Sequence, residues 1–282
     1  MIVPGSNTQT FATALAKETG DELAHVEYMD FPDGEFIVRV PEELDRAIIV
    51  ASMVSDRDHI EVLQLQDAAW EAGASEVITV LPYIGYSRQS EAFNVRQPVA
   101  TRAMARAIST RADRVLTVNP HQETVCDFFD VPARPLDAAG CLAEPLPDDL
   151  SDPLFVSPGE DTLELATTVR DTYGRGTVDY FGQTRDYETD EVEIAPRDTV
   201  LTDRDVVLVD DIIATGVTMS ESVASIQERD ANRVFVSCVH LMLAGNALTK
   251  LSRKNVEYIY GTDTIEHAAS DVSAASVVAE AL

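Results

Sequence analysis

The segment Val206–Thr218, which reads VVLVDDIIATGVT, decides the fold of this chain. Its leading apolar residues predict a buried strand, and Asp210 and Asp211 stand at the carboxyl end of that strand. The short loop Ala214–Thr218 follows and opens a helix. In open α/β sheets, ligands bind beyond the carboxyl ends of the strands, and the amide groups of a helix N-terminus favour a phosphate. We therefore expect a phosphate-binding loop at this place.

The residues of this loop suit both ends of a phosphorylated ribose. Gly216 lets the backbone approach a ligand closely, and Thr215 and Thr218 add hydroxyl donors. The carboxylates of Asp210 and Asp211 can accept hydrogen bonds from the vicinal hydroxyls of the sugar. The string Gly-x-x-x-x-Gly-Lys-Ser/Thr is absent, and no lysine lies near the loop in the sequence. A P-loop nucleotidase is therefore not expected.

Outward from this segment, strand-like apolar runs alternate with helical patterns along the whole chain. Strands are predicted at 47–50, 76–81, 114–118, 154–156, 205–209, 233–239 and 257–260, and helices at 59–72, 98–108, 162–173, 218–229 and 272–282. This alternation predicts an α/β fold of parallel strands and crossover helices. The length of 282 residues favours two domains, and the proline-rich stretch 132–153 is the best boundary candidate. We expect domains at 1–144 and 145–282.

Composition excludes several classes of protein. The net charge of −28 argues against nucleic acid as a partner. An acidic chain with three lysines suits a protein adapted to concentrated salt, where screening removes self-repulsion. The N-terminal residues do not form a signal peptide and no apolar run is long enough for a bilayer, so we expect a cytoplasmic protein without a membrane partner. The cysteines have neither disulfide-framework nor zinc-ligand spacing: Cys126, Cys141 and Cys238.

Three stretches in the first half carry polar groups at loops or strand ends. Phe31–Glu35 (FPDGE) predicts a turn with acids and an aromatic face. The polar loop 82–97 contains Arg88, a forked donor suited to phosphates, beside Gln89. His121 follows a predicted strand, which is a place for a metal ligand or for a capped surface residue.

The loop at 210–218 resembles the phosphoribosyl-binding motif of the type I phosphoribosyltransferase fold. Phe31–Glu35 and the Arg88–Gln89 pair resemble motifs of one group with that fold, the archaeal-type ribose-phosphate diphosphokinase (phosphoribosyl pyrophosphate synthase) family. The resemblance implies two phosphoribosyltransferase-type domains, each a mainly parallel sheet flanked by helices. It also implies a kinase of nucleotide biosynthesis that transfers the pyrophosphoryl group of ATP to the C1 hydroxyl of ribose 5-phosphate. The products are phosphoribosyl pyrophosphate and AMP.

The resemblance assigns expected roles residue by residue. It implies that ATP is bound by Phe31, Asp33, Glu35, Arg88 and Gln89, and that the catalytic groups are Arg88, His121 and Arg185. It gives Mg²⁺ as the cofactor, with His121 and Asp161 as metal ligands. Ribose 5-phosphate would be bound by Asp210, Asp211, Ala214, Thr215, Gly216, Val217 and Thr218. Since the family's FxDGE loop reaches the ATP of a neighbouring subunit, a homo-oligomer (dimer or hexamer) with an ATP site near a subunit interface is implied.

The chain departs from the family pattern at positions that affect chemistry. Gly159 stands where the family has Asp, and Gln183 stands where the family has a catalytic Lys. Gln carries no charge, and losing one transition-state contact typically costs about 10²–10³ in rate. Two alternatives therefore stay open beside the active synthase. One is a catalytically impaired, synthase-like regulatory subunit, and the other is a phosphoribosyltransferase that consumes phosphoribosyl pyrophosphate.

Overall fold

The protein is represented by a computed structural model that describes residues 1–92, 94–185, 192–195 and 199–282. By its packing the chain divides into two compact units. The first comprises Met1–Asp137, Asp263–Glu266 and Ser273–Leu282, and the second comprises Ala138–Thr262 and His267–Val272. In this division residues 138–144 pack with the second unit and residues 273–282 with the first, so the boundary at 144/145 stays a prediction. Among the described residues no helix combines the length and the apolar character that crossing a bilayer requires.

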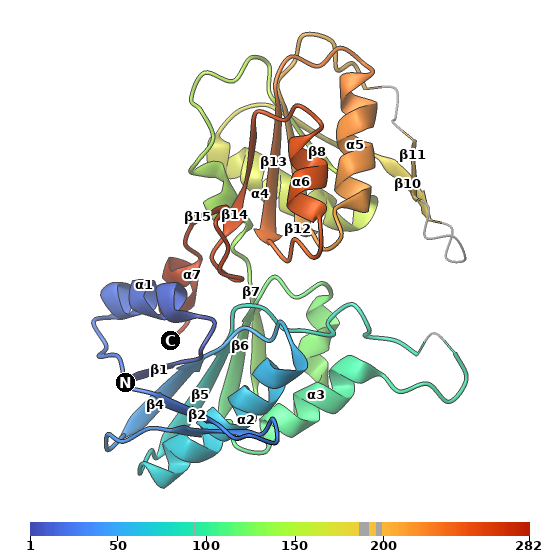
Figure 1. The fold of residues 1–282 in the computed structure, drawn as a ribbon. Coiled ribbons are helices and arrows are strands. Elements are labelled where there is room, and N and C mark those ends of the chain that lie inside the picture. The colour runs from blue at the N-terminus through green and yellow to red at the C-terminus, as the bar shows by residue number, and fades with distance from the viewer. Residues whose placement is uncertain (93, 186–191, 196–198) are drawn as a thin grey trace. The chain divides into compact units, whose positions relative to one another are not determined.

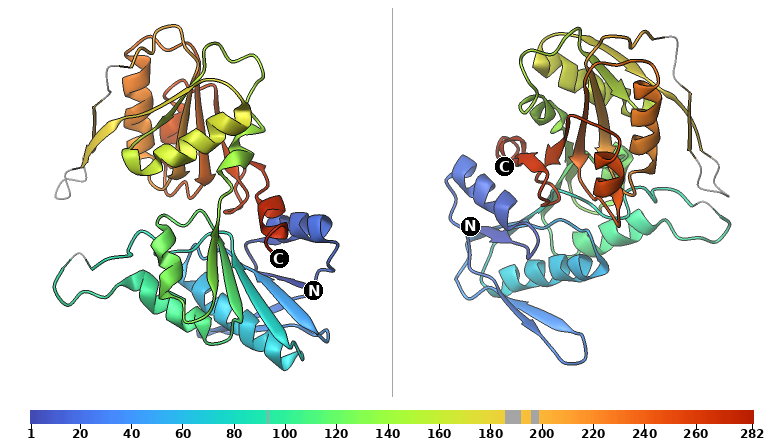
Figure 2. Two further views of the ribbon diagram at one scale, coloured as in Figure 1. Left: turned by 180° about the vertical axis from the view of Figure 1, so that it is seen from behind. Right: turned by 45° about the horizontal axis from the view of Figure 1, so that its top comes forward.

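The first unit contains a parallel sheet of five strands among the described residues, in the order β1-β4-β5-β6-β7. Figures 1 and 2 show α2 and α3 on the same face of this sheet. The bounds are β1 Ile2–Pro4, α1 Gln9–Thr19, β2 Glu27–Asp30, β3 Phe36–Arg39, β4 Arg46–Val50, α2 Asp56–Glu71, β5 Glu76–Leu81, α3 Ala100–Ser109, β6 Arg114–Val118, the 3-10 helix η1 Glu123–Phe128, β7 Ala133–Leu136 and α7 Ala275–Ala279.

The second unit contains a sheet of six strands among the described residues, in the order β15-β14-β13-β12-β8-β9 with parallel pairing throughout. Its α4 lies on one face, and α5 and α6 lie on the other (Figures 1 and 2). The bounds are η2 Ala139–Ala143, β8 Leu154–Ser157, η3 Glu160–Thr162, α4 Leu163–Tyr173, β9 Thr177–Tyr180, β10 Gly182–Arg185, β11 Val192–Ala195, β12 Val206–Ile212, α5 Val217–Gln227, β13 Val234–His240, α6 Ala247–Ser252, β14 Tyr258–Thr262 and β15 Ser270–Val272.

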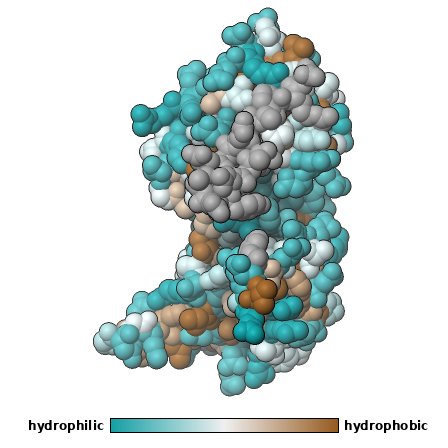
Figure 3. Space-filling model, turned by 90° about the vertical axis from the view of Figure 1, so that its right-hand side faces the viewer, coloured by the Kyte–Doolittle hydropathy of each residue, from teal (hydrophilic) through white to brown (hydrophobic). Residues whose placement is uncertain are grey.

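The predicted strands and helices are confirmed, with shifts at their ends. Strands that are buried on both faces read as continuous apolar runs, which is why β4, β5, β12 and β13 could be recognised. The terminal helix is shorter than predicted: α7 covers Ala275–Ala279 instead of 272–282. Hydrophilic side chains prevail on the face seen in Figure 3, in keeping with the acidic composition.

The segment Asp263–Glu266 belongs to the first unit although β14 and β15, on either side of it, belong to the second. The Glu266 carboxylate accepts hydrogen bonds from the N–H groups of Thr10 and Phe11, at 2.5 and 3.1 Å. These amides lie in the first turn of α1, where a carboxylate is favoured by the helix dipole. The Ser52 hydroxyl also donates to the Thr264 carbonyl at 2.5 Å. These bonds fix the segment to the first unit.

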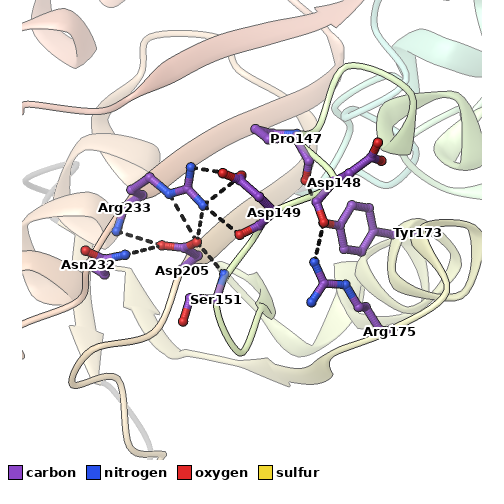
Figure 4. A network of polar contacts seen from close by, with 9 residues as sticks. All are labelled: Pro147, Asp148, Asp149, Ser151, Tyr173, Arg175, Asp205, Asn232 and Arg233. Atoms are coloured by element: carbon purple, nitrogen blue, oxygen red, sulfur yellow. Dashed lines mark hydrogen bonds and ion pairs between the residues drawn. The ribbon is translucent and has the colours of Figure 1, made fainter.

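A buried carboxylate ties together the amino ends of β12 and β13 (Figure 4). Asp205 is fully buried and accepts hydrogen bonds from the Ser151 N–H, the Asn232 amide and the Arg233 guanidinium, at 2.6, 2.7 and 2.6 Å. Arg233 also pairs with the exposed Asp149 at 3.2 Å. Burial works against ionisation of Asp205, yet the bonds from Arg233, Ser151 and Asn232 outweigh it and lower the pKa of the carboxyl.

We predict that Asp205→Asn lowers the free energy of unfolding by about 2–3 kcal/mol at pH 7, because it leaves the half-buried Arg233 with one carboxylate partner instead of two. Since the folded-state pKa of Asp205 is lowered, its contribution is complete at neutral pH and is lost as the pH falls through that pKa. The difference between variant and parent should therefore shrink below about pH 4. Chemical denaturation in molar KCl measures it, with the exposed Asp148→Asn as the control. Equal losses in the two variants would contradict the prediction.

Candidate functional site

The two carboxylates of the quoted segment lie inside β12, because the strand continues to Ile212 instead of ending at Val209. In the parallel register Asp210 lies opposite Cys238 of β13, and Ile212 lies opposite His240. Asp211 is buried, and Asp210 is half-buried. The pair thus occupies the carboxyl edge of the second sheet, where α/β proteins bind ligands.

The side chains around this pair carry negative charge. Burial, followed by the neighbouring Asp211 and the nearby Asp161, raises the pKa of Asp210 well above its usual range. Burial, followed by Asp210 and Asp211, raises the pKa of the Cys238 thiol, whose Sγ donates to the His240 carbonyl at 3.3 Å. Cys238 is therefore a packed, unreactive thiol. Two adjacent carboxyl groups with nearby negative charge are suited to accept hydrogen bonds from neutral hydroxyl groups.

The predicted loop 214–218 is a short connection followed directly by the first turn of α5. The helix begins at Val217, so Val217 and Thr218 are helical residues instead of loop residues. Gly216 precedes the helix in the left-handed region, at φ +69°. The Ser220 N–H donates to the Gly216 carbonyl at 3.0 Å. Because this is the first intrahelical bond, the amides of residues 217–219 have no acceptor within α5 and are available to an anion.

The connection is held from behind by the segment that follows β13. The Ile213 N–H donates to the His240 carbonyl at 3.1 Å, and the Ile213 carbonyl accepts from the Leu243 N–H at 2.8 Å. The Ala214 carbonyl accepts from the Ala244 N–H at 2.9 Å. These backbone bonds fix the loop before any ligand is present, which is the preorganisation a binding site needs.

One residue that sequence reasoning missed lies at this loop. The Nζ atom of Lys250, in α6, donates to the Thr215 carbonyl at 3.2 Å. No lysine lies near the loop along the sequence, but in the folded structure Lys250 contacts it, so the expectation that no lysine lies near the loop is wrong. The strand order could have indicated this contact. The connections after two neighbouring parallel strands lie at the same edge of a sheet, and Lys250 follows β13, the strand beside β12.

In the first unit, Phe31–Glu35 forms the turn of the β2–β3 hairpin, as the sequence predicts. The Phe31 N–H donates to the Glu35 carbonyl at 2.8 Å, and Gly34 adopts φ +93°. The side chains of Phe31, Asp33 and Glu35 are exposed, and the Phe31 ring keeps 42% of its surface accessible. An exposed aromatic ring with two acids at a hairpin tip is a surface for a polar, planar ligand.

The hairpin is attached to α2 by polar and apolar contacts. The Gln64 amide donates to the Phe36 carbonyl and accepts from the Val38 N–H, at 2.9 and 3.0 Å. The Arg57 guanidinium lies 3.9 Å from the centre of the Phe36 ring and pairs with Asp30 at 2.5 Å. These contacts give the exposed turn a defined position on the first unit.

The structure brings the Arg88 loop and the His121 segment together. The Ser90 hydroxyl donates to the Gln122 side chain at 2.7 Å, and the Gln89 N–H donates to the Tyr86 carbonyl at 2.7 Å. Arg88, Gln89 and His121 are all exposed. The predicted ATP-phosphate donors and the predicted metal ligand therefore share one side of the first unit, beyond the ends of β5 and β6.

The two predicted metal ligands lie in different units, and their joint role as metal ligands stays a prediction. His121 follows β6 in the first unit, Asp161 lies in η3 of the second, and both are exposed. The described residues hold no cluster of three or more His, Cys, Asp or Glu side chains suited to a metal. Mg²⁺ commonly uses few protein ligands and is completed by water and substrate phosphates, so sparse donors suit it.

The two departures from the family pattern lie near β8 and in β10. Gly159 is buried between β8 and η3, and its carbonyl accepts the Ser157 hydroxyl at 2.7 Å. Gln183 and Arg185 belong to β10, opposite Ile194 and Val192 of β11. The side chains of Gln183 and Arg185 lie outside the described part of the chain, so their predicted roles stay predictions.

Comparisons with known proteins agree with one another. Residues 1–111 match the family model of the N-terminal domain of ribose phosphate pyrophosphokinase, and residues 164–276 match that of the phosphoribosyl transferase domain. The chain is 56% identical to the ribose-phosphate pyrophosphokinase of Halobacterium salinarum over 284 residues, with both proteins covered in full. It is 39% identical to that of Methanosarcina mazei, covering 100% of this chain and 94% of the relative.

A solved structure confirms the fold class. The crystal structure of phosphoribosylpyrophosphate synthetase from Mycobacterium smegmatis matches with a TM-score of 0.85 at 23% sequence identity, covering 100% of this chain and 96% of that one. The expected architecture of two phosphoribosyltransferase-type α/β domains is therefore confirmed.

We predict that Asp210→Asn raises the free energy of unfolding by roughly 1 kcal/mol at pH 7, in the absence of ligands, as often happens when a functional charge is removed. Because the folded-state pKa of Asp210 is raised, its ionisation costs stability as the pH rises above the ordinary carboxyl range. The stability gained by Asp210→Asn should therefore disappear at acidic pH, where the Asp210 carboxyl of the parent is protonated. Denaturation in molar KCl measures it, with exposed Asp203→Asn as the control. An Asp210→Asn variant no more stable than its parent would refute this reading of the pair.

Proposed function

The chain belongs to the ribose-phosphate pyrophosphokinase family, and on that premise we propose that it transfers the pyrophosphoryl group of ATP to ribose 5-phosphate. The products are phosphoribosyl pyrophosphate and AMP. The observation that carries the proposal is the strand–loop–helix of the second unit, where Asp210 and Asp211 directly precede the free amides at the start of α5. The carboxylates accept hydrogen bonds from the sugar hydroxyls, and the amides receive the 5-phosphate.

The groups of the first unit suit ATP. Exposed Phe31 offers a ring for the adenine, and Asp33 and Glu35 accept hydrogen bonds from the base and ribose. Arg88 and Gln89, on the loop after β5, donate to the phosphates. His121 and Asp161 are the proposed protein ligands of Mg²⁺, which would neutralise phosphate charge when bound.

The reaction forms a bond between the C1 oxygen of ribose 5-phosphate and the β-phosphorus of ATP. The bond between that phosphorus and the oxygen bridging to the α-phosphate breaks, AMP leaves, and the C1 hydroxyl gives up its proton. Negative charge grows on the phosphoryl oxygens, and fixed cations stabilise it. Arg88 and Arg185 are the proposed cations, and the rest of the work of the site is positioning.

The proposal extends to assembly and location. An exposed Phe31 turn on a stable hairpin is consistent with contact to the ATP site of another subunit, so we propose a homo-oligomer, a dimer or a hexamer. We also propose that the reaction takes place in the cytoplasm, as expected from the sequence. Because the acidic composition suits concentrated salt, the assays below use molar KCl.

The regulatory-subunit alternative rests on Gly159 and Gln183, which replace a family Asp and Lys. We predict that the unmodified chain releases AMP from ATP, Mg²⁺ and ribose 5-phosphate in molar KCl, and that Gln183→Lys raises the rate by about 10²-fold or more through an added cation. Chromatographic quantification of AMP measures both. If the parent chain releases no AMP but the Gln183→Lys variant does, the chain is a synthase that has lost its activity.

We predict that Asp211→Ala abolishes ribose 5-phosphate binding, measured by calorimetry, because it removes one acceptor of the sugar hydroxyls from the buried pair. Circular dichroism should show an intact fold. Asp203→Ala, at an exposed turn of the same unit, is the control and should bind as the parent does. Unchanged affinity in Asp211→Ala would remove the carboxylate pair from the ribose site.

A further inference from the structure

Lys250 is the cationic side chain whose hydrogen bond reaches the loop 214–218 within the described part of the chain. The chain has three lysines against 49 acidic residues, and this one bonds to the loop that the proposed function assigns to a phosphate. The surroundings otherwise carry negative charge from Asp210, Asp211 and Asp161. A cation at the phosphate end of such a site reduces the repulsion that an incoming dianion meets.

The position of Lys250 is set by close packing between α6 and the loop. A Cβ atom on Gly216 would lie 3.2 Å from the Cβ of Ala247, so α6 meets the loop backbone directly. Ala247 begins α6, and Lys250 follows three residues later, on the same side of the helix. The Ala214–Ala244 backbone bond fixes the segment before α6 against the loop. This packing holds the backbone of Lys250 close enough to the loop for Nζ to reach the Thr215 carbonyl.

The bond to the Thr215 carbonyl determines where the next amide points. The carbonyl of Thr215 and the N–H of Gly216 belong to one peptide plane, and in a trans peptide they point in opposite directions. Lys250 holds the carbonyl on the α6 side. The Gly216 N–H is consequently directed away from the Nζ atom of Lys250.

We propose that Lys250 is a positioning residue for ribose 5-phosphate: it orients the Thr215–Gly216 peptide so that the Gly216 N–H faces the 5-phosphate, and its charge favours that dianion. This inference rests on the proposed function. Lys250 acts through the peptide and belongs to the binding of the sugar phosphate, not to the binding of ATP.

The test compares Lys250→Met, Lys250→Arg and the matched control Lys254→Met with the parent chain, all full length in molar KCl. Calorimetry gives the Kd of ribose 5-phosphate, kinetics give KM for each substrate, and thermal unfolding gives Tm. For Lys250→Met we expect Kd and KM for ribose 5-phosphate to rise about tenfold or more, as is usual when a charged hydrogen bond is lost. KM for ATP and Tm should stay near the parent values. The Lys250→Arg variant should keep most of the affinity for ribose 5-phosphate, and Lys254→Met should bind it as the parent does.

Each other result overturns the inference. Unchanged ribose 5-phosphate binding in Lys250→Met would remove Lys250 from the site, and equal weakening in the Met and Arg variants would contradict the role of its positive charge. A large fall in Tm with parallel losses for both substrates would make Lys250 a structural residue. A parent chain that binds no ribose 5-phosphate and releases no AMP would overturn the proposed function and this inference together, whereas an active parent with an unaffected Lys250→Met variant overturns the inference alone.

Discussion

The parallel pairing of β12 with β13 is the constraint on which the second unit depends. It places Asp210 beside Cys238 and brings the connections after both strands to one edge of the sheet. The connection after β12 supplies the free amides of α5, and the connection after β13 supplies the backbone bonds and the Lys250 side chain that hold the loop. A single register therefore aligns the acceptors for a sugar, the donors for a phosphate and their support.

The two ends of this strand pair have opposite electrostatics. At the amino end, the Asp205 carboxylate accepts hydrogen bonds from Arg233 and neighbouring amides. These bonds stabilise its ionised form and lower its pKa. At the carboxyl end, burial and the neighbouring acids raise the pKa of Asp210. Functional sites commonly contain groups that lower the stability of the folded protein, and interactions elsewhere in the fold compensate for this loss. In this unit the well-paired Asp205 carboxylate lies at the other end of the same two strands.

Much of the fold could be predicted from the sequence, because parallel strands buried on both faces read as continuous apolar runs. The carboxylate pair and the helix start could be predicted for the same reason, since they directly follow such a run. Contacts between distant segments could not. Lys250 reaches the loop through packing of α6, and residues 273–282 join the first unit through contacts that no local pattern reveals. The β2–β3 hairpin was recognised at its turn but not in its attachment to α2 through Gln64.

The central claim is that one strand–loop–helix binds both ends of ribose 5-phosphate. Calorimetric titration of the parent chain with ribose 5-phosphate, ribose and 2-deoxyribose 5-phosphate in molar KCl tests it most directly. The account predicts measurable binding of ribose 5-phosphate, with binding of both analogues weaker by about tenfold or more, because each leaves buried or preorganised groups without a partner. Binding of either analogue as tight as that of ribose 5-phosphate would contradict the assignment of the corresponding end of the site.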